Sequence, residues 1–101
     1  MTTGTLDIVR SQLAAQEAEL RRRGVRHLSV FGSVARGEDR AESDVDIAVE
    51  IEEGHAFSLI RMEDARLLLE DALHRPVDLG EIVSFRPRVR EAFERDRVPI
   101  F

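Results

Sequence analysis

Two aspartates lie two residues apart at the start of a segment whose pattern predicts a β-strand. Over Val45–Ile51 every second residue is Val or Ile, and Asp44 and Asp46 occupy alternate positions. Because successive strand side chains point to opposite faces, both carboxylates leave the same face. Two carboxylates this close repel each other unless one keeps a proton or a cation lies between them. Mg²⁺ suits the second arrangement, because it accepts a few carboxylates and keeps positions for water and phosphate oxygens.

A third carboxylate, Asp78, lies in a short predicted strand, Val77–Leu79. If this strand lies beside the one that follows Asp44, Asp78 completes a cluster of three carboxylates. Each motif alone also has an ordinary structural explanation. Asp-x-Asp pairs are common on solvated strand edges, and a single Asp at a strand end is often a turn residue.

Gly32 and Ser33 follow another predicted strand, Val25–Phe31, and open a turn. Glycine lets the backbone approach a ligand closely, and a serine hydroxyl with nearby N–H groups can face an anion. Arg36 lies one helical turn further along and can project to the same side. Taken alone, Gly-Ser also fits an ordinary turn with serine as the helix N-cap.

Length and composition limit the function classes. The 101 residues form one predicted domain, 1–101, with 43% hydrophobic residues, no cysteine, and five Phe but no Trp or Tyr, so we expect an aliphatic core. The net charge of −5 argues against a general nucleic-acid binder. All 15 basic residues are arginine, which excludes lysine chemistry such as a P-loop. Neither a membrane span nor a signal peptide is expected, and the cytoplasm is the expected compartment.

The elements that must position these residues alternate between helix and strand. Helices are predicted over Thr5–Arg23, ended by Gly24, over Ala56–His74, with Leu59, Met62, Leu69 and Leu73 on one stripe, and from Pro87 onward. The tail Val98–Phe101 is expected to dock on the domain. The order α-β-α-β-α-β-α predicts an α/β domain with a small sheet of three to four strands. The aliphatic face of Val45–Ile51 must pack on helices, so we expect the aspartate face to lie outside the core.

The combined pattern is more specific than its parts. Ten residues separate Gly32-Ser33 from Asp44-Val45-Asp46, with Arg36-Gly37 among them, and Val77-Asp78-Leu79 follows later. In these motifs the chain resembles the minimal nucleotidyltransferase domain of the DNA polymerase beta superfamily, whose small members include the antitoxins of HEPN/MNT toxin–antitoxin pairs. The resemblance covers essentially the whole chain, and no motif position departs from it. It implies the nucleotidyltransferase fold, a small mixed β-sheet packed with helices.

The resemblance also implies a reaction, in which a nucleoside monophosphate passes from an NTP to a hydroxyl and pyrophosphate is released. Gly32 and Ser33 would hold the β- and γ-phosphates of ATP, with Arg36 assisting. Ser33 is therefore expected among the catalytic residues. Ser43 is expected to act as a local cap that shapes the turn before the Asp-x-Asp motif.

The same resemblance assigns the carboxylates. Asp44 and Asp46 would bind two Mg²⁺ ions, and Asp78 would bind the metal on the nucleophile side and help deprotonate the attacking hydroxyl. Mn²⁺ is a second candidate, because both ions favour oxygen ligands. The implied acceptor is a tyrosine of a partner HEPN ribonuclease toxin, which AMPylation silences. A hetero-oligomer with that toxin is the expected assembly.

Two other functions remain open at this point. One is an antitoxin that inhibits its toxin by contact alone, without catalysis. The other is a nucleotidyltransferase with a small-molecule or RNA acceptor. The net negative charge weakens the RNA alternative, although the C-terminal region carries a basic cluster, Arg86, Arg88, Arg90, Arg95 and Arg97. Salt-bridged, solvated helix faces have the same composition.

Overall fold

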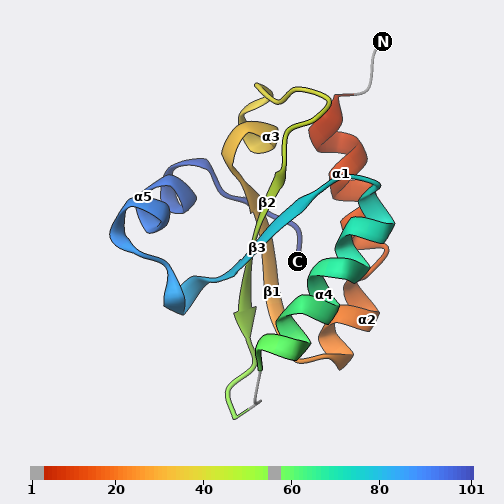
Figure 1. The fold of residues 1–101 in the computed structure, drawn as a ribbon, viewed down its shortest axis with the longest axis vertical. Helices are drawn as coiled ribbons and strands as arrows, with labels where there is room; N and C mark the ends of the chain where they lie inside the picture. The colour runs from red at the N-terminus through yellow and green to blue at the C-terminus, as the bar shows by residue number, and fades with distance from the viewer. Residues whose placement is uncertain (1–3, 55–57) are drawn as a thin grey trace.

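A four-stranded mixed sheet in the order β3-β2-β1-β4 organises the chain (Figure 1). The computed structural model describes residues 4–54 and 58–101. Strand β1 (Val25–Phe31) pairs antiparallel with β2 (Val45–Ile51) and with β4 (Val98–Pro99). Strand β3 (Val77–Glu81) runs parallel to β2 at the edge of the sheet. The α/β class and the small mixed sheet predicted from the sequence are confirmed.

Helices lie on both faces of this sheet. Helices α1, α2 and α4 cover one face, and α5 lies on the other (Figure 1). None of the helices in the described ranges combines the length and the hydropathy that crossing a bilayer requires. The helical elements are α1 (Thr5–Ala14), α2 (Glu17–Arg22), α3 (Gly32–Arg36), α4 (Leu59–Leu73), the short 3₁₀ helix η1 (Ile82–Ser84) and α5 (Pro87–Asp96).

The N-terminal helix is interrupted. A single helix over Thr5–Arg23 was the expectation, and it is wrong, because the chain turns at Ala15 and Gln16 between α1 and α2. The turn lets α1 pack against α3 and α4 while α2 packs against β1. As a result, Leu13 of α1 and Leu20 of α2 are both fully buried. The predicted end of the helical region at Gly24 is confirmed, with a left-handed φ of 99° that favours glycine there.

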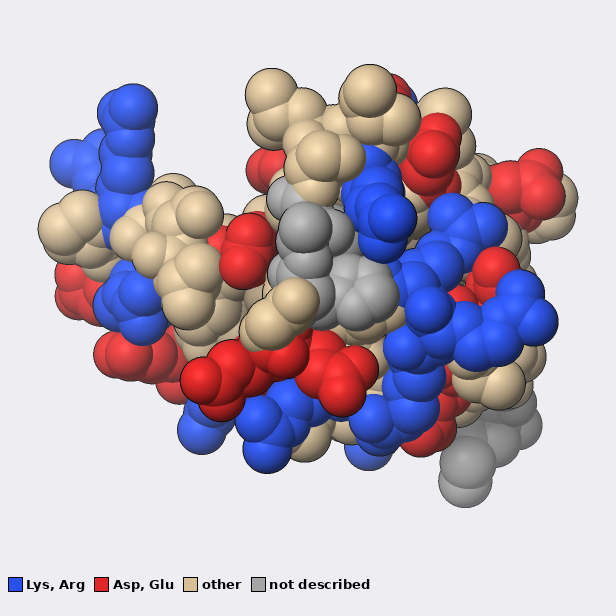
Figure 2. All heavy atoms as spheres, turned by 90° about the horizontal axis from the view of Figure 1, so that it is seen from below, with Lys and Arg blue, Asp and Glu red and all other residues tan. Residues whose placement is uncertain are grey.

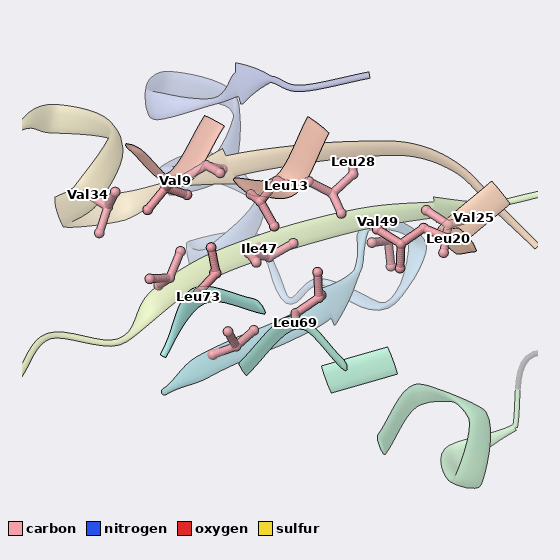
Figure 3. Packing of buried hydrophobic residues seen from close by; sticks show 13 residues of the cluster. Val9, Leu13, Leu20, Val25, Leu28, Val34, Ile47, Val49, Leu69 and Leu73 are labelled. Atoms are coloured by element: carbon pink, nitrogen blue, oxygen red, sulfur yellow. The ribbon is translucent and has the colours of Figure 1, made fainter. Parts of the chain in front are cut away.

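The main core is aliphatic, as composition predicts. Val45, Ile47 and Val49 of β2 are buried against side chains of the helices on that face. Figure 3 shows Leu13 and Leu69 pointing toward the strands from opposite sides of this cluster. Burying these side chains removes apolar surface from water, and this burial holds the helices on the sheet.

A second, smaller hydrophobic cluster covers part of the other face of the sheet. Ala48 lies two residues beyond Asp46 on the same face, and it is fully buried with Phe31 and Phe93. The expectation that the aspartate face lies outside the core is therefore wrong for the second half of β2, because α5 covers it. The rings of Phe31, Phe85 and Phe93 stand 5.7–5.8 Å apart between centroids. This aromatic cluster leaves only the start of β2 open for chemistry.

Helix α4 buries only part of the predicted stripe, because Leu69 and Leu73 are buried whereas Met62 is only partly buried. Ser58 caps it, its Oγ accepting the Arg61 N–H at 3.2 Å, and the predicted start at Ala56 lies outside the described residues. Leu59 was expected on the buried stripe, but it is 89% exposed. The buried residues are Ala65, Leu69 and Leu73, and the helix packs against α1 and β3.

The C-terminal elements follow the prediction closely. Helix α5 begins at Pro87, as proline at a first helical position favours. The tail returns to the sheet, where Val98 pairs with Val30 in β1. Strand β3 extends two residues beyond the predicted Val77–Leu79.

We predict that the aromatic cluster on the α5 face contributes strongly to stability. Phe93→Ala removes a buried ring from between two others and should lower the free energy of unfolding by about 3–5 kcal/mol, measured by urea denaturation. Val89→Ala on the same helix, where the side chain is 40% exposed, should change it by no more than about 0.5 kcal/mol. Equal losses in the two variants would contradict this assignment of the core.

Candidate active site

The sheet register brings two of the predicted carboxylates side by side. In the parallel β2–β3 pair, Asp46 lies directly opposite Asp78. Directly opposed residues in neighbouring strands point to the same face. Asp44 immediately precedes β2, two residues before Asp46, and so belongs to that face as well. Asp44 and Asp78 are exposed, whereas Asp46 is half-buried between them and the sheet.

Electrostatic strain concentrates on the central carboxylate. The pKa of Asp46 is raised to about 6, chiefly because burial disfavours the charged form, and further because of the negative charges of Asp78 and Asp44. The positive charge of Arg36 partly offsets this rise in the pKa. The three carboxylates therefore lie close enough to repel one another, and Arg36 offsets only part of this repulsion.

Gly32 lets the Asp46 carboxylate lie close to the backbone at the start of α3. It follows Phe31, which lies opposite Asp46 in the β1–β2 register, and it has a left-handed φ of 76°. A Cβ at this position would collide with the Asp46 Oδ2 atom, so only glycine lets the carboxylate stand this close to the backbone. Ser33 follows in the first turn of α3 and is half-buried. The predicted Gly-Ser turn and the carboxylates therefore share one end of the sheet.

Arg36 forms ion pairs with two acidic residues of the protein. Its guanidinium donates to Asp96 Oδ2 at 2.7 Å and to Glu38 Oε2 at 3.0 Å. The first contact links α3 to the end of α5, where the Asp96 side chain is nearly buried. Arg36 therefore fastens the Gly-Ser turn to α5, and its role as a phosphate contact stays a prediction.

Side-chain hydrogen bonds hold the loop before Asp44. Ser43 Oγ accepts the Arg40 N–H at 2.9 Å, which confirms the predicted local cap. Arg75 donates to Asp39 Oδ2 at 3.1 Å and to the carbonyl oxygens of Arg40 and Ser43.

The ion pairs of Asp39, Arg75 and Asp96 were not predicted from the sequence. The burial of a charged residue depends on which distant residue pairs with it, so periodicity gives no sign of these contacts. The position of Arg75 three residues before Asp78 was the one available signal.

The donor set fits a hard divalent cation. Among residues 4–54 and 58–101, no three His, Asp or Glu side chains are already arranged as a complete metal site. Mg²⁺ does not need one, because it binds through one or two carboxylates and fills its other positions with water and phosphate oxygens. The repulsion among the carboxylates, and the Gly32 backbone that lies close to Asp46, are consistent with a cation carrying a phosphorylated ligand.

Arginines gather at the end of the molecule away from α3, where acidic residues stand among them (Figure 2). Four of these arginines pair with glutamates: Arg21 with Glu17 at 2.7 Å, Arg22 and Arg23 with Glu19 at 2.7 and 3.0 Å, and Arg26 with Glu50 at 3.9 Å. The surface is therefore less basic than its number of arginines suggests, and the carboxylate cluster remains the better candidate for chemistry.

We predict that Asp46 lowers stability at neutral pH in the absence of metal. Its folded-state pKa of about 6 lies above the ordinary aspartate value of 3.8, so the folded state binds this proton more tightly than the unfolded state does. The resulting stability is present below about pH 4 and is lost as the pH rises through 6. Asp46→Asn should therefore be more stable than the wild type at pH 7, by about 1–2 kcal/mol after allowance for solvent screening.

Urea denaturation in the presence of a chelator, at several values between pH 4 and pH 7.5, measures this difference. The gap between Asp46→Asn and the wild type should widen with pH. A gap that stays constant across this range would show that the Asp46 carboxylate is not strained.

The sequence matches a known protein family and its members. The nucleotidyltransferase domain model matches residues 13–100. Protein adenylyltransferase MntA of Thermococcus cleftensis is 46% identical over 95 residues, which cover 93% of this chain and 94% of the relative.

Solved structures agree with this match. A minimal nucleotidyltransferase superposes with a TM-score of 0.77 at 37% identity and covers 93% of this chain and 94% of its own. A structure of the tri-AMPylated Shewanella oneidensis HEPN toxin in complex with MNT antitoxin matches at a TM-score of 0.69 over 95% of this chain and 71% of that chain, but its 18% identity shows a shared fold alone. With these matches and the geometry of its carboxylates, the chain belongs to the nucleotidyltransferase domain family and is a nucleotidyltransferase.

Proposed function

We propose that this protein transfers AMP from ATP to a hydroxyl group of a partner HEPN toxin and so silences the toxin. The observation that carries the proposal is the placement of Asp46 beside Asp78, with Asp44 two residues away and the Gly32 backbone close to the Asp46 carboxylate. The relative of 46% identity is a protein adenylyltransferase, which supports AMP as the group transferred and a protein as the acceptor.

In this proposal the three aspartates are the metal ligands. Asp44 and Asp46 would hold two Mg²⁺ ions, with Asp78 as a further ligand. The ions would stabilise charge on the oxygens that enter and leave phosphorus and would offset the charge of the triphosphate. The half-buried Asp46 gains most from a bound cation, because burial and its two acidic neighbours raise its pKa when no cation is present.

The transfer itself is a displacement at the α-phosphorus. The acceptor oxygen forms a bond to this phosphorus while the bond to the β-phosphate oxygen breaks, and pyrophosphate leaves. The acceptor proton passes to the Asp78 carboxylate, which is exposed and can release it to water. Gly32 and Ser33 would hold the β- and γ-phosphates, and the charge of Arg36 would favour their approach.

The position of Asp78 suits a protein acceptor. Strand β3 is an edge strand, so a tyrosine on another protein can reach Asp78 without entering a closed pocket. The Shewanella oneidensis complex, in which a HEPN toxin carries three AMP groups beside MNT antitoxin, offers a parallel for this arrangement. These features favour a HEPN toxin over a small molecule as the acceptor.

We predict that AMP transfer depends on the aspartates. The wild type, Mg²⁺ and ATP labelled at the α-phosphate should label a co-expressed HEPN toxin and abolish its ribonuclease activity. Asp44→Asn and Asp78→Asn should each slow labelling by at least about 100-fold, since each removes a proposed metal ligand. Asp71→Asn, which changes an exposed acid on α4, is the matched control and should label at the wild-type rate.

A different outcome would favour inhibition by contact alone. If no label reaches the toxin and Asp44→Ala still neutralises it, the proposed function is wrong.

We also predict that the two left-handed glycines beside α3 behave differently. The Cβ of Gly37→Ala would meet no atom within 4 Å, so this variant should leave ATP affinity unchanged. Its left-handed φ of 73° disfavours alanine and should lower the free energy of unfolding by about 1–2 kcal/mol. Gly32→Ala adds the collision with Asp46, so it should be less stable still and bind ATP at least about 10-fold more weakly by calorimetry with Mg²⁺. Equal ATP affinity in both variants would argue against a phosphate site at Gly32.

A further inference from the structure

One arginine outside the nucleotidyltransferase motifs connects the two segments that lead to the carboxylates. Arg75 lies just before β3, and its side chain is only 16% exposed. It forms an ion pair with Asp39, whose side chain is 9% exposed, at 3.1 Å. Its Nη2 donates to the carbonyl oxygens of Arg40 at 2.8 Å and Ser43 at 2.9 Å. One guanidinium thus serves three acceptors along the loop between α3 and β2.

The backbone adds a second link at the next residue. The Val45 N–H donates to the Pro76 carbonyl oxygen at 2.9 Å. Residues 75 and 76 therefore hold the chain at Ser43 and at Val45, on both sides of Asp44. The same two residues lead directly into β3, where Asp78 follows. The position of Asp44 relative to Asp78 is thereby set by a short, doubly attached connection.

Stability alone does not explain an arginine at this position. The Arg75 Nε is buried and has no hydrogen-bond partner among the described residues. Burying a charged group with an unsatisfied N–H costs free energy, and an apolar residue would avoid that cost. What the arginine provides is a rigid planar fork that reaches several acceptors in fixed directions, which lysine cannot reproduce.

We propose that Arg75 is a positioning residue that holds Asp44 and Asp78 at the separation needed to share metal ions with Asp46. The proposal rests on the proposed function, because it takes these aspartates as the metal ligands. It adds a residue that touches neither metal nor nucleotide and acts through the backbone on either side of Asp44. Residues of this kind, which orient metal ligands, typically change metal affinity by about 10–100-fold when replaced.

The first test measures metal binding and needs no catalysis. Mn²⁺ is titrated calorimetrically into the protein saturated with a non-hydrolysable ATP analogue. Arg75→Gln should bind Mn²⁺ about 10–100-fold more weakly than the wild type. In the metal-free protein, the Val45 amide should exchange with solvent at least about 10-fold faster. Arg23→Gln, which breaks an ion pair with Glu19 on α2, is the matched control and should leave both quantities unchanged.

The second test separates positioning from general stability. In AMP transfer, Arg75→Gln should lower kcat with little change in the KM for ATP, and raising the Mn²⁺ concentration should restore part of the rate. Arg75→Lys keeps the charge but not the fork, so it should bind Mn²⁺ more weakly than the wild type by at least about 5-fold. If Arg75→Gln does not fold, Arg75→Lys decides the matter.

A folded Arg75 variant with a lower melting temperature but wild-type Mn²⁺ affinity would overturn the proposal. The failure of the proposed function is distinguishable from this result. If the wild type binds Mn²⁺ with the analogue but transfers no AMP, the function fails, while the affinity comparison still decides the role of Arg75.

Discussion

The mutual repulsion of three carboxylates at one end of a small sheet is the constraint on which this structure depends. Asp46 is half-buried opposite Asp78 and two residues from Asp44, and its pKa is raised to about 6 as a result. A fold that gathers negative charge in this way loses stability near neutral pH unless a cation is bound. We propose that this arrangement serves as a site for divalent ions, which would attract the phosphorylated substrate.

The rest of the fold holds that cluster in place and limits its size. The parallel β2–β3 pair sets the register, and the aliphatic side of β2 fixes which face the aspartates use. The aromatic cluster under α5 closes the far half of that face, so chemistry is confined to the end near Gly32. Arg36 and Arg75 connect this end to α5 and to the start of β3, and each does so through a carboxylate that is nearly buried.

The sequence predicted what depends on local pattern. The bounds of β1 were predicted to the residue, because Gly24 and Gly32 flank it. Strict alternation marked β2, and the spacing of Gly32-Ser33 from Asp44 pointed to the family. It did not predict the break between α1 and α2, since good helix formers continue through Ala15 and Gln16 and only packing against different partners separates the helices. The α5 cover over Ala48 and the contacts of Arg75 were missed for the same reason, because both depend on residues far apart in the chain.

The central claim is that Asp44, Asp46 and Asp78 together hold the ions that bind the nucleotide. The most direct measurement is a crystal structure of the protein with Mn²⁺ and a non-hydrolysable ATP analogue, with the metal located by its anomalous scattering. We expect metal density in contact with all three carboxylates, with the triphosphate lying along Gly32 and Ser33. Density that leaves Asp78 out of contact, or a triphosphate bound away from Gly32, would contradict this claim.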